Sequence, residues 1–180
     1  DPWLQMHDQL TRPLAAIVGC LPQEVVVMNS LTVNLHLLLA SFYRPQGKRN
    51  KILCEVKAFP SDQYMLETHV RHYGFVPDEV IVEVVPGESL QAIERYKDEL
   101  ALVMMGGLNY YAGQVLDMTA ITSAAQATGA KVGFDLAHAA GNIPLQLHDW
   151  NVDFAAWCSY KYLNSGPGAI GGVYIHERYH

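Results

Sequence analysis

The amino-acid sequence predicts an α/β fold, a three-layer sandwich with a mainly parallel sheet. Short apolar runs rich in valine, isoleucine and leucine alternate with longer segments of helical periodicity, the pattern of strands joined by helical crossovers. Half of the 180 residues are hydrophobic and 17% are charged, which suits a sheet buried on both faces. The sequence shows no repeat and no shift in composition, so we expect a single domain.

The first part of the chain predicts a helix, a strand and a second helix, in that order. Residues 3–18 have helical spacing, and Pro13 predicts an interruption within them. Residues 25–28 form an apolar run that predicts a strand. Asn29 and Ser30 are typical helix caps. They precede a segment with apolar side chains at helical intervals: Leu31, Leu35, Leu38, Leu39 and Phe42.

The next part predicts two further strand and helix pairs. Residues 51–56 are apolar enough for a buried strand. The turn at 59–62 leads into a helix that runs to about residue 73, where Gly74 predicts its end. Residues 80–85 predict a third strand, and 89–97 a weaker helix.

The last part predicts one helix and four strands. Residues 100–105 form a strand, and 117–130 form a helix with apolar side chains on one face. Strands follow at 131–134 and 153–157, and at 173–175 we expect a last strand in a hairpin with its neighbour. The chain starts at Asp1 without methionine and stops just after this strand, so we expect it to be part of a longer protein.

Composition and charge exclude several classes of function. The net charge of −6 provides no basic surface for nucleic acid or for an anionic membrane. No apolar run approaches the roughly 18 to 20 residues of a membrane span. The three cysteines, Cys20, Cys54 and Cys158, have no paired spacing, which favours free thiols in a reducing cytoplasm. The histidines are scattered without metal-ligand spacing, so we expect no metal site.

Lys161 and Asp135 are the strongest functional candidates in the sequence. Lys161 follows an apolar run at 152–158 and precedes a loop rich in glycine. A lysine delivered to a partly desolvated position suits Schiff-base chemistry. Asp135 ends another apolar strand. A Schiff-base lysine together with an aspartate for a pyridinium nitrogen is typical of pyridoxal phosphate (PLP) enzymes. Taken alone, Lys161 could be a surface lysine and Asp135 a helix cap.

Other candidates also follow strand ends, where open α/β sheets bind ligands. Residues 29–32 join a strand to a helix N-terminus, which is either a simple cap or a phosphate site. Phe59 either stacks on a flat ligand ring or points into the core. His138 either contacts Asp135 or a cofactor, or is structural. Tyr160 faces the site if the chain turns there, and is a core residue otherwise.

Five segments closely resemble the kynureninases, which are PLP enzymes of the fold-type I aminotransferase superfamily. These segments are MNSLTVNLH at 28–36, FPSD at 59–62, GFDLAHAAGN at 133–142, LHDWNVDF at 147–154 and WCSYKYLN at 157–164. The resemblance covers nearly the whole chain in order. Related cysteine desulfurases usually carry histidine directly before the lysine, whereas this chain has Tyr160, which favours the kynureninases.

The resemblance implies a cofactor, a reaction and a set of site residues. The cofactor would be PLP, bound covalently by Lys161, with Asp135 at its ring nitrogen and Tyr160 at its phosphate. The reaction would be hydrolytic Cβ–Cγ cleavage of L-kynurenine or 3-hydroxykynurenine, giving L-alanine and anthranilate or 3-hydroxyanthranilate, in tryptophan catabolism and NAD biosynthesis. The remaining cofactor-binding residues implied are Leu31, Thr32, Phe59, Pro60, Ser61, Asp62, Gly106 and His138.

The resemblance also sets the expected boundaries and alternatives. Residues 1–180 would form an incomplete PLP-binding large domain that lacks an N-terminal segment and a C-terminal small domain. The protein would be a cytoplasmic homodimer acting on a small amino-acid substrate, binding neither nucleic acid nor membrane. Gly106 departs from the family, in which many members place a hydroxyl residue there. Two alternatives stay open: a cysteine desulfurase-like PLP lyase, and a PLP-free scaffold subunit.

Overall fold

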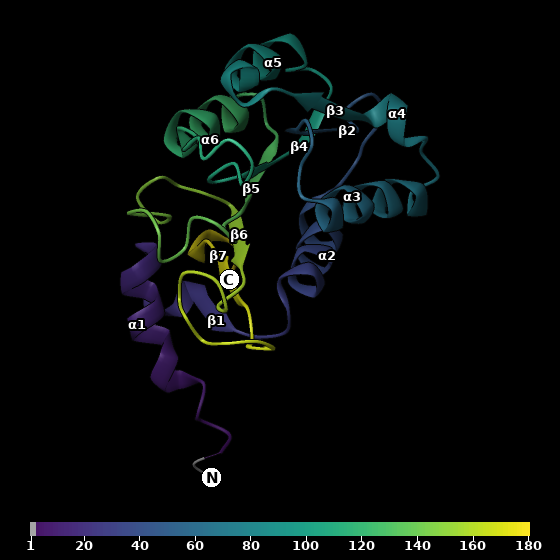
Figure 1. Cartoon of the computed structure of the whole chain (residues 1–180). Helices are drawn as coiled ribbons and strands as arrows, with labels where there is room; N and C mark the ends of the chain where they lie inside the picture. Colours follow the sequence, from purple (N-terminus) through teal and green to yellow (C-terminus); the bar gives the residue numbers. More distant parts are fainter. Residues whose placement is uncertain (1–2) are drawn as a thin grey trace.

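The computed structural model describes residues 3–180 and has alternating helices and strands (Figure 1). The helices are α1 (Asp8–Val18), α2 (Leu31–Phe42), α3 (Pro60–His72), α4 (Pro77–Val80), α5 (Ser89–Arg95) and α6 (Met118–Ala127). The strands are β1 (Val25–Val27), β2 (Lys51–Glu55), β3 (Ile81–Val84), β4 (Leu100–Gly106), β5 (Lys131–Asp135), β6 (Phe154–Trp157) and β7 (Gly172–Ile175). Short 3-10 turns lie at Pro22–Glu24, Pro86–Glu88 and Glu177–Tyr179.

Within residues 3–180, seven strands form one sheet in the order β1-β7-β6-β5-β4-β2-β3. The pairs that join β3, β2, β4, β5 and β6 are parallel, whereas β7 is antiparallel to both β6 and β1. The predicted hairpin-like pairing of the last strand is therefore confirmed. All strands except β7 run in one direction, so their carboxyl ends meet at one edge of the sheet.

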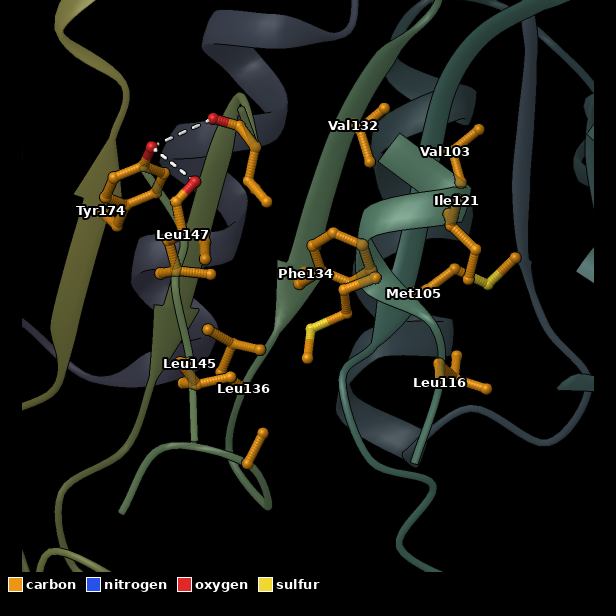
Figure 2. Close-up of a cluster of buried hydrophobic side chains, with 14 of the residues drawn as sticks. Val103, Met105, Leu116, Ile121, Val132, Phe134, Leu136, Leu145, Leu147 and Tyr174 are labelled. Carbon is orange, nitrogen blue, oxygen red and sulfur yellow. Dashed lines mark hydrogen bonds between the residues drawn. The ribbon is translucent and has the colours of Figure 1, made fainter. Parts of the chain in front are cut away.

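Helices cover both faces of this sheet, which confirms the three-layer α/β sandwich (Figure 1). Helices α2, α3 and α4 pack on one face, around Leu35, Met65 and Val80. Helices α1, α5 and α6 pack on the other face. Figure 2 shows part of this second core, including Phe134 of β5 and Tyr174 of β7. The strands alternate between the two cores, as a doubly covered sheet requires.

Details of three elements differ from the sequence prediction. Pro13 does not interrupt α1 but lies inside it, although an interior proline costs about 3 kcal/mol. Strand β3 begins at Ile81 because Pro77 starts a separate one-turn helix that ends at Val80. Ser30 is the N-cap residue of α2, but its side chain makes no capping hydrogen bond.

Candidate active site

Four loops at the carboxyl edge of the sheet enclose a cavity of about 220 Å³. Each loop follows a different one of the strands that run in the same direction, so the sheet itself brings these distant segments together. The sequence-predicted residues that line the cavity are Leu31, Thr32, Phe59, Ser61, Asp135, His138, Tyr160 and Lys161. A smaller adjoining cavity shares Phe59, Asp135 and His138, and adds Asp62 and Gly106. Pro60 lines neither cavity; it occupies the first turn of α3, where a missing N–H costs nothing.

Lys161 lies in the cavity wall and is hydrogen-bonded to His138. Its Nζ is 3.0 Å from Nε2 of His138 and 5.5 Å from the centre of the Phe59 ring. Burial, and then the positive charge of Lys161, lower the pKa of His138. Because an ammonium can only donate, neutral His138 accepts this hydrogen bond. The alternative partner expected from the sequence, Asp135, does not bond to the His138 ring.

Asp135 and Asp62 form a pair of carboxyl groups beside the lysine. One oxygen of Asp135 accepts the backbone N–H of Ala137 at 2.7 Å, which holds the carboxylate at the end of β5. Asp62 is buried and is hydrogen-bonded to Asp135. Its Oδ1 also accepts a hydrogen bond from the Ser61 hydroxyl at 3.3 Å. Burial, and then the charge of Asp135, raise the pKa of Asp62. Asp62 is therefore protonated at neutral pH and can donate its hydrogen bond to Asp135.

The N-terminus of α2 provides an anion-binding end to the cavity. The backbone of Asn29 is left-handed, with φ of 49°, and its side chain donates to Oδ1 of Asn34 at 3.2 Å. Asn29 therefore does not cap α2, contrary to the prediction, and Ser30 makes no side-chain cap either. The first N–H groups of α2, beside Leu31 and Thr32, can then bind an anion, which the helix dipole favours.

Phe59 and Tyr160, which the sequence left open as possible core residues, both lie at the cavity instead. Phe59 is 45% exposed and therefore does not point into the core. Tyr160 is 49% exposed and lines the cavity because β6 ends at Trp157 and the chain then turns. Burial, and then a hydrogen bond with Cys158, raise the pKa of Tyr160.

Sequence reasoning missed Glu55, Asn109 and Tyr110, which line the adjoining cavity. Glu55 is the last residue of β2, just as Asp135 is the last residue of β5. A carboxylate at the end of a strand could have identified Glu55 as a candidate, but Glu55 lies within a run that was interpreted only as a buried apolar strand. Burial raises the pKa of Glu55, and N–H groups of Gly106 and Asn109 partly oppose this effect.

Comparisons with known proteins agree with this geometry. Residues 6–180 match the model of the aminotransferase class-V family. A kynureninase of Flavobacterium johnsoniae is 60% identical over 99% of this chain and 44% of its own length. A kynureninase of Nematostella vectensis is 53% identical over 99% of this chain and 40% of its own length. The chain thus spans less than half the length of the curated relatives it matches.

Solved structures share the fold at low sequence identity. The apo cysteine desulfurase of Thermococcus onnurineus has a TM-score of 0.78 at 20% identity, over 96% of this chain and 43% of that one. A cystine C-S lyase in complex with cysteine persulfide has a TM-score of 0.81 at 22% identity, over 95% of this chain and 46% of that one. These likenesses show the α/β fold alone. Because the family model covers nearly every residue, the chain belongs to the aminotransferase class-V family.

Proposed function

We propose that the protein is a PLP-dependent kynureninase and that Lys161 is its cofactor-binding lysine. The observation that carries this proposal is the convergence of Lys161, His138 and Asp135 on one cavity that ends at a helix N-terminus, with Asp62 hydrogen-bonded to Asp135 from the adjoining cavity. An identity of 60% to a curated kynureninase, spread over the whole chain, supports the choice of reaction.

The residues present fit PLP in chemical character. Leu31 and Thr32 would hold the phosphate at the N-terminus of α2, with Tyr160 contributing its hydroxyl. Phe59 would stack on the ring. Asp135 would pair with the ring nitrogen, and Asp62, which is hydrogen-bonded to Asp135, would hold that side chain in place.

The proposed reaction takes up one water and divides the substrate between Cβ and Cγ. L-Kynurenine gives anthranilate and L-alanine, and 3-hydroxykynurenine gives 3-hydroxyanthranilate and L-alanine. When bound, PLP supplies an electron sink for electrons released at the substrate α-carbon. The amine of Lys161 would remove the α-proton, while His138 accepts a hydrogen bond from Nζ and so holds it at the cavity wall.

The assembly and location follow from the same proposal. Residues 1–180 would be part of the PLP-binding large domain of a homodimer. Cytoplasmic location is supported by the three cysteines of the described chain, all of which are free thiols. Across residues 3–180, every helix is too short or too polar to cross a membrane.

Two substrates tested side by side discriminate the proposed function from its alternatives. The full-length protein that carries this chain, loaded with PLP, is incubated with L-kynurenine and separately with L-cysteine. Anthranilate fluorescence without sulfide is the expected result. Sulfide without anthranilate would move the function to the desulfurases, and a protein that binds no PLP would favour the scaffold alternative.

A further inference from the structure

Glu55 is a buried carboxylate that the proposed reaction does not use. It is 5% exposed and ends strand β2, next to β4 in the sheet. Its Oε2 accepts the backbone N–H of Gly106 at 3.0 Å, and its Oε1 accepts the side-chain N–H of Asn109 at 3.3 Å. One carboxylate thus joins the end of β2 to the end of β4 and to the loop that follows it.

Asn109 is held in one orientation by the loop that it begins. Its Oδ1 accepts the backbone N–H groups of Tyr111 at 3.0 Å and Ala112 at 2.8 Å. Its amide nitrogen, which can only donate, is thereby directed at Glu55. Turning the amide over would break both backbone bonds. The site therefore requires an acceptor at position 55.

The loop beyond Asn109 carries Tyr110 onto two residues of the candidate active site. The Tyr110 ring is 5.5 Å from the Phe59 ring in an edge-on contact, and 6.1 Å from the His138 ring. These three rings line the smaller cavity together with Asp135. The position of Tyr110 thus depends on the loop, and the loop depends on Asn109 and Glu55.

We propose that Glu55 and Asn109 form a bracket that positions Tyr110 against Phe59 and His138 and so shapes the PLP site. The inference rests on the proposed function, because it concerns the affinity of that site for PLP. Glu55 and Asn109 are positioning residues. They act on the cofactor through the loop and do not touch the reacting atoms.

The bracket accounts for Gly106, the position that departs from the family pattern. A Cβ at this residue would lie 2.8 Å from Oε2 of Glu55, closer than such contacts allow. In this chain, glycine at position 106 leaves room for the carboxylate, whose bond to the Gly106 N–H anchors the bracket to β4.

Exchanging the donor and the acceptor tests the bracket directly. Glu55→Gln places an amide N–H against the N–H of Asn109, and Asn109→Asp places two carboxylates face to face. In the double variant, the new amide at position 55 can donate to one oxygen of the new carboxylate at position 109, while the other oxygen keeps both backbone bonds. Net charge is then the same as in the original protein. The contact is thus broken in each single variant and restored, with reversed polarity, in the double one.

Two measurements on the full-length protein report on these variants. The first is the dissociation constant for PLP, from equilibrium dialysis. The second is hydrogen exchange at the Tyr111 and Ala112 amides without PLP. Each single variant should weaken PLP binding about tenfold, and the double variant should return to within about twofold of the original, because each single variant leaves a buried polar group unsatisfied. Exchange should accelerate in the single variants and slow again in the double variant.

Glu83→Gln is the matched control, since Glu83 is exposed on the neighbouring strand β3 and pairs in register with Cys54, next to Glu55. This control should leave both measurements unchanged. Single variants that match the control, or a double variant no better than the worse single variant, would overturn the bracket. If the unaltered protein binds no PLP, the proposed function fails, while hydrogen exchange still decides whether the bracket exists.

Discussion

Lys161 reaches the cavity because the chain turns directly after β6. The Ser159 hydroxyl donates to the Ile170 carbonyl at 2.5 Å, and the Ser165 N–H donates to the Ser159 carbonyl at 3.1 Å. These bonds close the loop on itself and place the lysine opposite His138. The turn thus brings Lys161 to the cavity wall, where its Nζ lies 3.0 Å from Nε2 of His138.

The first prediction concerns this lysine. Lys161→Ala should lower kcat for kynurenine by at least about a thousandfold, because a group that moves the α-proton and holds the cofactor is removed. It should also remove the visible absorption of the cofactor-loaded protein. Lys97→Ala, at an exposed lysine, is the control and should retain both properties. Near-normal turnover in Lys161→Ala would show that another residue carries the chemistry.

The second prediction concerns the hydrogen-bonded pair of Asp62 and Asp135. Asp62→Asn removes the titrating carboxyl but keeps a side chain that can donate to Asp135. Because the pKa of Asp62 is raised, Asp62 is already neutral at neutral pH, so PLP affinity at pH 7 should change less than about threefold. Asp135→Asn should weaken binding more than about tenfold, since it removes the charge at the proposed ring nitrogen. Equilibrium dialysis measures the PLP affinity of both variants. Equal losses of affinity in Asp62→Asn and Asp135→Asn would contradict the separate roles given to the two residues.

At the scale of elements, the contact between β5 and β6 depends on a glycine. A Cβ at Gly133 would lie 2.0 Å from the Phe154 ring, which lies directly over this strand. Gly133→Ala should therefore lower the free energy of unfolding by about 1–3 kcal/mol through overpacking. Gly87→Ala is the control because no atom lies near its added methyl group. Thermal unfolding of the two variants measures this difference. Equal unfolding midpoints for Gly133→Ala and Gly87→Ala would contradict the close packing of Phe154.

The sequence alone predicted most elements because strands and helices here carry strong, distinct periodicities. It predicted the convergence of Asp135 and Lys161 because both follow parallel strands. It could not predict the boundary of β3, where Pro77 starts a separate turn of helix. It also missed Glu55, since a carboxylate at a strand end becomes meaningful only when the neighbouring strand is known. The role of Asn109 could not be predicted either, because it lies in an irregular loop whose shape leaves no periodic pattern in the sequence.

At the scale of the whole molecule, the two edges of the sheet have different roles. The candidate site lies at the carboxyl edge. At the opposite edge, Glu24, His148 and His176 come together from three distant segments. Glu24 accepts the backbone N–H groups of Leu21 and Glu177, and lies 3.0 Å from Nδ1 of His148. This cluster ties the start of β1 to the end of β7.

The Glu24–His148 contact predicts a pH dependence of stability. Hydrogen bonding to Glu24 raises the pKa of His148 above 6.5, so its contribution is complete below about pH 6.5 and is lost as pH rises through the raised value. Burial acts to raise the pKa of Glu24. Hydrogen bonds from the backbone N–H groups of Leu21 and Glu177 act in the other direction and help to bring this pKa below 4.5. The contribution of Glu24 is therefore present above about pH 4.5 and is lost as pH falls through the lowered value.

The stability lost in His148→Gln should consequently be largest between about pH 4.5 and 6.5 and smaller at about pH 9. His176 stacks on His148, and burial and Arg178 lower its pKa, so it does not compete for the proton. Thermal unfolding across this pH range measures the effect. Because the cluster lies at the opposite edge from the site, PLP affinity should stay unchanged. A loss of stability that does not vary with pH would refute the ionic contribution.

We propose that Lys161 forms the covalent link to PLP in this cavity. Borohydride reduction of the PLP-loaded full-length protein, followed by digestion and mass spectrometry, locates the lysine that carries the cofactor. We predict a pyridoxyl group on the peptide that contains Lys161, and its loss when kynurenine is added before reduction. A pyridoxyl group on another lysine, or on none, would contradict the account.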